Sequence, residues 1–207
     1  MNIIESLKWR YATKSFDKNK KISSQEWSKI EDALILSASS FGLQPWKFVV
    51  INDAETRKKM TPLSWNQTQV EDSSHYVVFC AKNDIDADYV EKFISSIAST
   101  RHIDKSSLEQ YKQMMVGFVN NLGKEELLNW AKKQCYIALG NILTVASTME
   151  IDACPMEGIN PIGYDDIIKI SGYNTVFTCA FGYRSESDQY AKLSKVRFSK
   201  EEIIHHI

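Results

Sequence analysis

The chain has 207 residues, 43% of them hydrophobic and 25% charged, and its formal net charge is −1. This length and composition suit a single domain over residues 1–207 with a sizeable core. The balanced charge gives no reason to expect nucleic acid or a membrane as partner, and no apolar run approaches the length of a membrane span.

A short amphipathic helix is predicted near the start of the chain, from its apolar and basic positions at helical spacing. It leads into the polar segment 10–17, in which Arg10 and Lys14 bracket a threonine. Arginine and lysine side chains that a fold brings together can bind phosphate. The plainer interpretation is that both are solvated surface charges.

Residues 23–26 fit a capping box, beside a hydrophobic staple of Ile22 and Trp27, and predict a helix that runs to Ala38. The chain then passes through SSFGLQPW at residues 39–46. Hydroxyls, free main-chain N–H groups and a glycine can together bind phosphate or a polyhydroxyl chain. Alternatively, Ser-Ser-Gly ends the helix and Pro-Trp packs the next strand.

Three apolar runs predict strands, at residues 47–51, 76–81 and 175–183. The first has the composition of a buried strand, and the second is unbroken and therefore expected to be covered on both faces. Residues 84–99 and 106–122 predict two polar helices, which we interpret as a peripheral excursion over residues 84–122. The second is expected to begin with a capping box at Ser106 and to end at Gly123. The apolar tip at 114–118 either covers a pocket or is ordinary helix packing.

Asp53 is predicted to cap a short helix through Met60, and residues 63–72 predict a second, polar helical stretch. Asn66 and Gln69 are three residues apart, so a helix would present both on one face. Two side-chain amides can recognise the donor–acceptor edge of a heterocycle, although solvent exposure is the simpler outcome.

The longest predicted helix covers residues 124–149 and carries no charge from Cys135 to Met149. Its apolar residues occupy more than one face, so it should be buried nearly all round. A small domain has few places for such a helix, and an interface between two copies of the chain is the natural one.

Two further segments have the chemistry of a ligand site. Pro155, Glu157 and Gly158 predict a turn with exposed N–H groups, where the glycine permits close approach by a flat molecule. The alternative is a tight connection between a helix and a strand. In the extended arm at about 184–207, Lys195 and Arg197 should point to one side and can hold a phosphate, unless the terminus is frayed and solvated.

The four cysteines are far apart and form no C-x-x-C pair, so we expect buried, reduced thiols in a cytoplasmic protein. Cys154, predicted to lie in a loop before Pro155, leaves a nucleophilic role open. The first residues lack the basic start and apolar core of a signal peptide. The four histidines have no ligand spacing, so no metal is expected.

These motifs, in this order and spacing, resemble the FMN-dependent nitroreductase family over nearly the whole chain. The resemblance rests on RYATKSF at 10–16, SSFGLQPW at 39–46, Asn66 with Gln69, Trp130 with KKQ at 132–134, PMEG at 155–158 and KVR at 195–197. It implies an α+β fold with a central mixed, mainly antiparallel sheet flanked by helices, in an intertwined homodimer with two FMN sites at the interface.

By matching position, the resemblance implies that Arg10, Lys195 and Arg197 hold the flavin phosphate, and that Lys14 lies at the pyrimidine side of the ring. It further implies that Asn66 and Gln69 contact the polar edge of the ring. Residues 155–158, including Pro155, lie near flavin N5, where Glu157 and Gly158 offer main-chain N–H groups. Ser39 and Ser40 come from the other subunit, and Gly42 is a further cofactor-binding position.

Three positions depart from the family pattern. Many relatives have Ser or Thr where this chain has Ala12, so one hydroxyl is missing at the phosphate. Some have Asn in place of Gly42, and some have Lys in place of Gln69. The last departure removes a positive charge beside the flavin and affects its redox tuning.

The resemblance implies an NAD(P)H-dependent FMN oxidoreductase that works by alternating half-reactions. Hydride passes from NADH or NADPH to flavin N5, and then to a nitroaromatic or quinone-type acceptor. No side-chain nucleophile is needed. A specialised flavin dehydrogenase or dehalogenase of the same fold, or a flavin-binding protein without turnover, are the alternatives.

Overall fold

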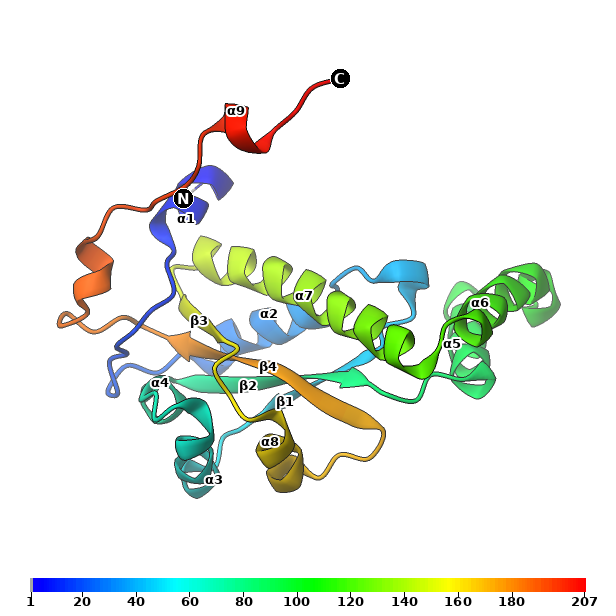
Figure 1. Cartoon of the computed structure of the whole chain (residues 1–207), viewed down its shortest axis with the longest axis horizontal. Coiled ribbons are helices and arrows are strands. Elements are labelled where there is room, and N and C mark those ends of the chain that lie inside the picture. Colours follow the sequence, from blue (N-terminus) through cyan, green and yellow to red (C-terminus); the bar gives the residue numbers. More distant parts are fainter. Residues whose placement is uncertain (1) are drawn as a thin grey trace.

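The computed structural model describes residues 2–207, in which helices cover both faces of a four-stranded sheet (Figure 1). The strands are β1 (Trp46–Val50), β2 (His75–Lys82), β3 (Asp152–Met156) and β4 (Tyr173–Gly182). The α-helices are α1 (Ile3–Trp9), α2 (Ser24–Ile35), α3 (Ala54–Met60), α4 (Gln69–Asp72), α5 (Ala87–Arg101), α6 (Glu109–Asn121), α7 (Lys124–Thr148), α8 (Pro161–Ile168) and α9 (Lys200–Ile203). Short 3₁₀ turns lie at Ser40–Gly42, Pro62–Ser64, Lys105–Leu108 and Gln189–Lys192.

The strand order is β1-β2-β4-β3, and all three pairings are antiparallel. A parallel contact occurs at the isolated bridge between Ala12 and Ala153. The predicted α+β fold with a mainly antiparallel sheet is therefore confirmed. β2 is buried between two neighbours, as its unbroken apolar run predicts, whereas β1 is only half-buried because it forms an edge of the sheet.

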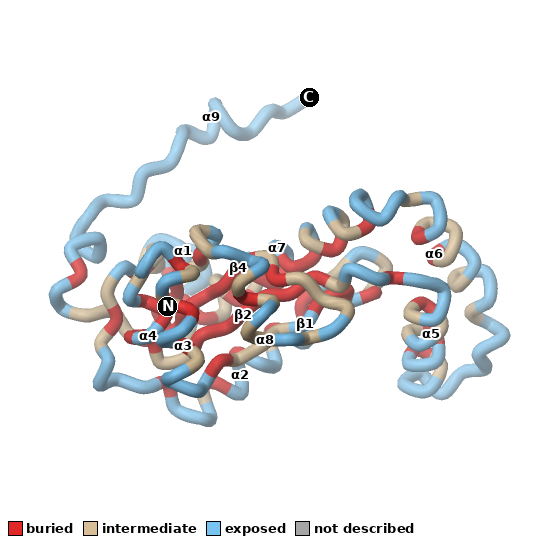
Figure 2. The backbone as a smooth tube through the Cα atoms, turned by 60° about the horizontal axis from the view of Figure 1, so that its bottom comes forward, coloured by how far each residue is buried: buried red, intermediate tan, exposed pale blue. Residues whose placement is uncertain are grey.

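Alternation along the strands divides the interior into two cores. Val77 and Phe79 of β2 face a larger core under α2 and α7, in which Phe79 stacks on Phe177 with ring centroids 4.6 Å apart. Tyr76 and Val78 face a smaller core under α3, α4 and α8. This is the period-two pattern of a strand covered on both faces (Figures 1 and 2).

The long helix α7 is confirmed at Lys124–Thr148. One side packs on the sheet and α2, and Leu139 on that side is only 8% exposed. Away from that side Ile137 is 47% exposed in the single chain, and Tyr136, which packs its ring against Phe177 of β4, is 41% exposed. Within the single chain, α7 is therefore buried on the side that faces the sheet and α2, and not all round as expected.

Several predicted boundaries are wrong. α2 ends at Ile35, three residues before Ala38. The stretch 63–72 is not one helix, because Trp65 and Asn66 have φ of 54° and 55°, which breaks it into a 3₁₀ turn and the short α4. Cys154 and Pro155 lie in β3 and not in a loop, and this edge position tolerates the missing N–H of proline.

The predicted helices of the excursion appear as α5 and α6, at one end of the molecule (Figure 1). The predicted capping box at Ser106 does not form. Instead, Asp104 accepts a hydrogen bond from the Ser106 N–H and begins a 3₁₀ turn that leads into α6. Gly123 caps the start of α7 and does not end α6.

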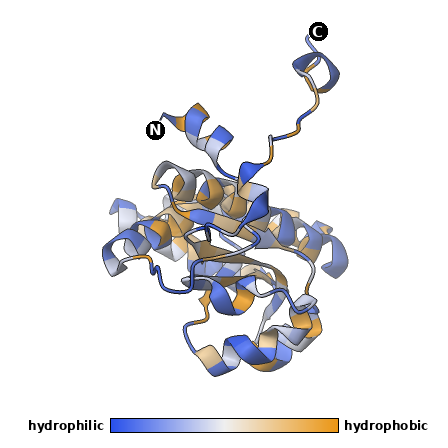
Figure 3. Cartoon of the chain, turned by 90° about the vertical axis from the view of Figure 1, so that its left-hand side faces the viewer, coloured by the Kyte–Doolittle hydropathy of each residue, from blue (hydrophilic) through white to orange (hydrophobic). Residues whose placement is uncertain are grey.

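At the opposite end of the molecule the arm that follows β4 passes beside α1, and its last residues extend away from it (Figure 1). Phe16 bridges to Arg184, and the Ser185 N–H donates to the Ser15 carbonyl at 2.8 Å. Beyond residue 192 the arm is exposed and mixes charged residues with apolar ones, among them Val196, which is 84% exposed (Figure 3).

Candidate functional site

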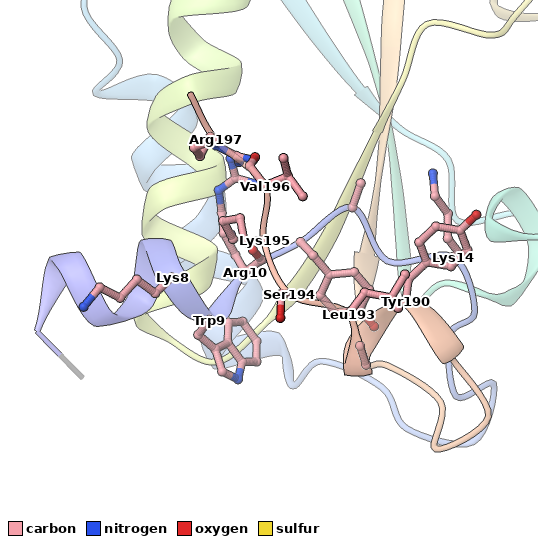
Figure 4. A pocket seen from close by; sticks show the side chains of 13 residues that line it. Lys8, Trp9, Arg10, Lys14, Tyr190, Leu193, Ser194, Lys195, Val196 and Arg197 are labelled. Carbon is pink, nitrogen blue, oxygen red and sulfur yellow. Dashed lines mark hydrogen bonds between the residues drawn. The ribbon is translucent and has the colours of Figure 1, made fainter. Parts of the chain in front are cut away.

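A cavity of about 460 Å³ lies between the first loop and the C-terminal arm. Its lining residues come from the two ends of the sequence: Lys8, Trp9, Arg10, Tyr11, Ala12, Lys14, Tyr190, Ala191, Leu193, Ser194, Lys195, Val196 and Arg197. Of the thirteen residues proposed to bind a cofactor, this cavity brings together Arg10, Ala12, Lys14, Lys195 and Arg197. Figure 4 shows the two arginines with Lys195 at one end and Lys14 beside Tyr190 at the other.

The cavity holds positive charges without carboxylate partners. Among the described residues no salt bridge involves Arg10, Lys195 or Arg197. Burial and the nearby Arg197 charge lower the pKa of Arg10, and burial with the charges of Arg10 and Arg197 lowers the pKa of Lys195. Like charges that disfavour one another in this way make a site for an anion.

Lys195 also docks the arm on the first helix. Its ammonium group donates hydrogen bonds to the carbonyl oxygens of Leu7, at 2.8 Å, and of Arg10. These carbonyls lie at the C-terminal end of α1, where a cation is favourable. The lysine therefore joins the two walls of the cavity, a role that its spacing from Arg197 could not reveal.

Beneath the cavity lies an ion pair that the sequence interpretation missed. Arg184 forms a bidentate contact with the buried carboxylate of Asp152, with its NH2 group 2.6 Å from Oδ1. The guanidinium also lies 4.1 Å from the ring centroid of Trp9 and 4.7 Å from that of Tyr11. It thereby orients two aromatic side chains that line the cavity.

The amide and turn residues form a second group. Asn66 is exposed in its left-handed conformation, whereas Gln69 is buried in α4. They do not share a helix face, so the geometric reason for pairing them is wrong. Gln67, which the sequence interpretation did not single out, donates its amide to the carbonyl of Gly158 at 3.4 Å and links this segment to the 155–158 turn.

Gly158 does accommodate a flat group at close range. A Cβ at this position would lie 2.7 Å from the Trp65 ring, so a side chain would displace the indole. Next to it, Glu157 accepts a hydrogen bond of 2.5 Å from the Tyr136 hydroxyl of α7, and burial together with Glu157 raises the pKa of Tyr136 to about 12. Pro155 is half-buried in β3.

Ser39, Ser40 and Gly42 lie apart from the cavity in the single chain. None of them lines it, and Figure 1 shows the turn that follows α2 toward the α5–α6 end of the molecule, away from α1. The Ser40 N–H donates to Gln134 Oε1 at 2.9 Å, and Ser39 Oγ accepts from the Gln44 N–H at 3.0 Å.

The structure argues against the nucleophilic role for Cys154. All four cysteines are free and buried, and burial raises the pKa of the Cys154 thiol, so it stays protonated at neutral pH. Over residues 2–207 no cluster of three or more His, Cys, Asp or Glu side chains is placed to hold a metal ion. No described helix has the length and apolar character needed to cross a bilayer.

The family model described as "Nitroreductase family" matches residues 7–183. A provisionally named NAD(P)H nitroreductase of Staphylococcus saprophyticus is 35% identical, and the alignment covers 98% of this chain and 95% of that protein. Two solved structures share the fold. The ydfN protein of Bacillus subtilis has a TM-score of 0.88 at 18% identity, with 99% and 98% of the two chains covered. An Exiguobacterium sibiricum protein in complex with FMN has a TM-score of 0.87 at 22% identity, with 100% and 98% covered. The chain belongs to the nitroreductase family.

Proposed function

We propose that this protein is an FMN-dependent oxidoreductase that uses NADH or NADPH to reduce small electron-poor molecules, with nitroaromatics and quinones as the first acceptors to test. Family membership supports the oxidoreductase class. The name of the staphylococcal relative supports the reductant, and the FMN complex of a protein with the same fold supports the cofactor.

The observation that carries the proposal is the group of unpaired cations at the cavity between the chain ends. Arg10, Lys195 and Arg197 provide charge and N–H donors for one terminal phosphate. The sequence contains no G-x-G-x-x-G motif for a dinucleotide, which favours FMN over FAD. Ala12 lines the same cavity without a hydroxyl, so the phosphate must rely on these cations.

When bound, FMN supplies the hydride-transfer chemistry through its N5 atom, in alternating half-reactions with reductant and acceptor. The residues of this chain bind and orient it. Lys14 would provide a positive charge for the pyrimidine side of the ring, Asn66 and Gln69 would provide amides for its polar edge, and Glu157 and Gly158 would offer their main-chain N–H groups to N5. The Tyr136 hydroxyl binds the Glu157 carboxylate, which leaves the main-chain N–H of this residue as the group available to the flavin.

We further propose that the active form is a homodimer. Ser39, Ser40 and Gly42 lie away from the cavity of their own chain, as residues that serve the partner's cofactor must. Apolar side chains of α1 and α7 also lack cover in the single chain, with Ile3 and Ile4 each 56% exposed and Ile137 47% exposed. The four reduced thiols support a cytoplasmic location.

The purified protein should be yellow from bound FMN, and this is the first test. Heat release followed by chromatography identifies the flavin, and stopped-flow mixing with NADH or NADPH tests turnover. A carrier that binds flavin without catalysis would keep it oxidised. A panel of nitroaromatics, quinones, halogenated phenols and enones then separates a broad reductase from a specialised dehydrogenase or dehalogenase. Recovery of FAD, or no flavin after reconstitution, would refute the proposal.

A further inference from the structure

The loop between α2 and β1 has a backbone that most sequences avoid. Phe41, Gly42 and Gln44 have φ of 57°, 73° and 49°. For residues other than glycine the left-handed region is unfavourable, so two such residues within four positions persist only where their surroundings hold them. The same loop carries Ser39 and Ser40, so its conformation decides where their hydroxyls point.

Two tyrosines of the helical excursion hold the carbonyl groups of this loop. The Tyr111 hydroxyl on α6 donates to the Phe41 carbonyl at 2.8 Å. The Tyr89 hydroxyl on α5 lies 3.0 Å from the Leu43 carbonyl and 2.9 Å from the Gln44 carbonyl, between which it shares its proton. Burial raises the pKa of Tyr89 to about 12, so this donor is protonated at physiological pH.

The same helices also pack against the loop. A Cβ on Gly42 would lie 3.1 Å from the ring of Phe93 on α5, so a larger residue there would have to move this ring. The ring of Phe41 packs on that of Phe118 on α6, with centroids 5.0 Å apart. The loop is therefore restrained by hydrogen bonds and by apolar contacts from both helices of the excursion.

From these contacts we infer that Tyr89 and Tyr111 are positioning residues, which hold the loop so that Ser39 and Ser40 reach the FMN site of the other subunit. This inference rests on the proposed function and extends it. It gives the α5–α6 excursion a role in cofactor binding, although neither helix contributes a residue to the cation cavity. It also explains why unfavourable backbone conformations are kept in a loop that could end α2 more simply.

The two tyrosines could instead have a purely structural role, which would be to attach the excursion to the sheet. A matched control variant separates this role from the positioning of the loop. Tyr173 lines the same surface groove as Tyr89, and Lys82 Nζ lies 5.4 Å and 5.1 Å from their respective ring centroids. In the described chain the Tyr173 hydroxyl makes no hydrogen bond to residues 39–44. Tyr173→Phe thus removes a comparable hydroxyl without releasing the loop.

The first experiment measures FMN dissociation constants by fluorescence for wild type, Tyr89→Phe, Tyr111→Phe and Tyr173→Phe. We expect a rise of about threefold to tenfold for each of the first two and no change for the control, with each protein's melting temperature measured alongside. Unchanged affinity in both loop variants would refute the positioning role. A wild-type protein that binds no FMN would refute the proposed function itself.

The second experiment tests which subunit the loop serves. One protomer carries Tyr89→Phe with Tyr111→Phe, the other carries Lys195→Ala with Arg197→Ala, and two affinity tags isolate the mixed dimer. If the loop serves the partner, one site combines both defects and the other combines an intact loop with intact cations. Half of the sites should then bind FMN with wild-type affinity. If no site recovers wild-type affinity, the loop serves its own subunit and the inference is wrong.

Discussion

The carboxylate of Asp188 accepts a hydrogen bond of 2.8 Å from the main-chain N–H of Lys14, 174 residues earlier in the sequence. The same oxygen accepts from the Ser15 N–H at 3.0 Å and the Tyr11 hydroxyl at 2.9 Å, and the other oxygen accepts from the Tyr190 N–H at 2.9 Å. One buried side chain therefore joins the first loop to the C-terminal segment, and with them the two walls of the cation cavity.

Replacing Asp188 with Asn should loosen both walls at once. The amide cannot accept from all four donors, so we expect a loss of about 1–3 kcal/mol in the free energy of unfolding and weaker FMN binding. Burial raises the pKa of Asp188, but the Ser15, Lys14 and Tyr11 donors outweigh it and lower the pKa overall. Because the pKa of Asp188 is lower in the folded state than in the unfolded chain, its ionised carboxylate stabilises the fold at pH values above the ordinary pKa of about 3.9. This stabilisation is lost as the pH falls through the lowered pKa of the folded state. Urea unfolding should thus show a difference from wild type at pH 7 that shrinks in acid; an equal difference at every pH would exclude the ionised carboxylate as its cause.

Lys195→Ala with Arg197→Ala should weaken FMN binding mainly through the phosphate. Losing two charge-assisted contacts at about 1.5–3 kcal/mol each corresponds to a few orders of magnitude in Kd. Riboflavin, which has no phosphate, should bind wild type and variant alike by fluorescence titration. Lys192→Ala with Lys200→Ala is the control, because both lysines are exposed and neither lines the cavity. Equal losses for FMN and riboflavin would assign the two cations another role, such as docking the arm on α1.

Ile137→Glu should dissociate the proposed dimer and leave the fold intact. Ile137 is 47% exposed in the single chain, so a charge there costs little until a partner covers it, when an unpaired carboxylate costs several kcal/mol. Light scattering should show a monomer whose FMN content falls with the dimer. Ile162→Glu on α8, where the isoleucine is 74% exposed, should stay dimeric. A flavin-loaded monomer would contradict both the dimer and its shared site.

Lys14→Met should lower the midpoint potential of bound FMN. Reduction leaves negative charge on the pyrimidine side, so a nearby ammonium group stabilises the reduced form more than the oxidised one. A unit charge a few Å away in a partly wet site contributes roughly 1–3 kcal/mol, which for two electrons corresponds to about 20–60 mV. Glu157→Ala should barely change the potential, because its assigned role is that of its N–H. Dye-coupled reduction measures both; an unchanged potential with FMN still bound would remove Lys14 from the ring.

His75 should make the fold sensitive to mild acid. Burial, with the charges of Arg57 and Lys21, lowers its pKa to about 4 from an ordinary value near 6.5. The neutral ring stacks on Trp27 at a centroid distance of 3.9 Å. The contribution of the neutral ring to the free energy of unfolding is complete above pH 6.5 and is lost as the pH falls toward 4. The loss is about 1–2 kcal/mol once solvent screening of this half-buried ring is allowed for. His75→Phe should flatten this slope of melting temperature against pH, and the exposed His206→Phe should not; a slope that survives in His75→Phe would exclude this histidine.

The sequence predicted the elements whose signals are local. The capping box at Ser23 and the unbroken apolar run around Val77 depend on neighbours within a few positions, and the structure confirms both as α2 and the buried strand β2. The break at Trp65 and Asn66 could not be predicted in this way, because their left-handed conformations reflect contacts made after the chain folds back on Gly158.

The same limit applies to the candidate site. The residue types at Arg10, Lys195 and Arg197 were sufficient to predict an anion site, because charge chemistry does not depend on the fold. Asp188, Arg184 and Tyr89 were missed, since each acts through a main chain or ring more than 40 positions away. Without a fold, nothing distinguishes them from ordinary polar residues.

The order of synthesis gives the cavity between the chain ends a further consequence. Lys195 is translated 185 residues after Arg10, so the anion site cannot be completed until all of the intervening chain has been made. A ligand stabilises only a form that can bind it, so the nascent protein must hold its two cores together without help from a cofactor. The supply of FMN should therefore affect how long the finished protein persists, but not whether its sheet assembles.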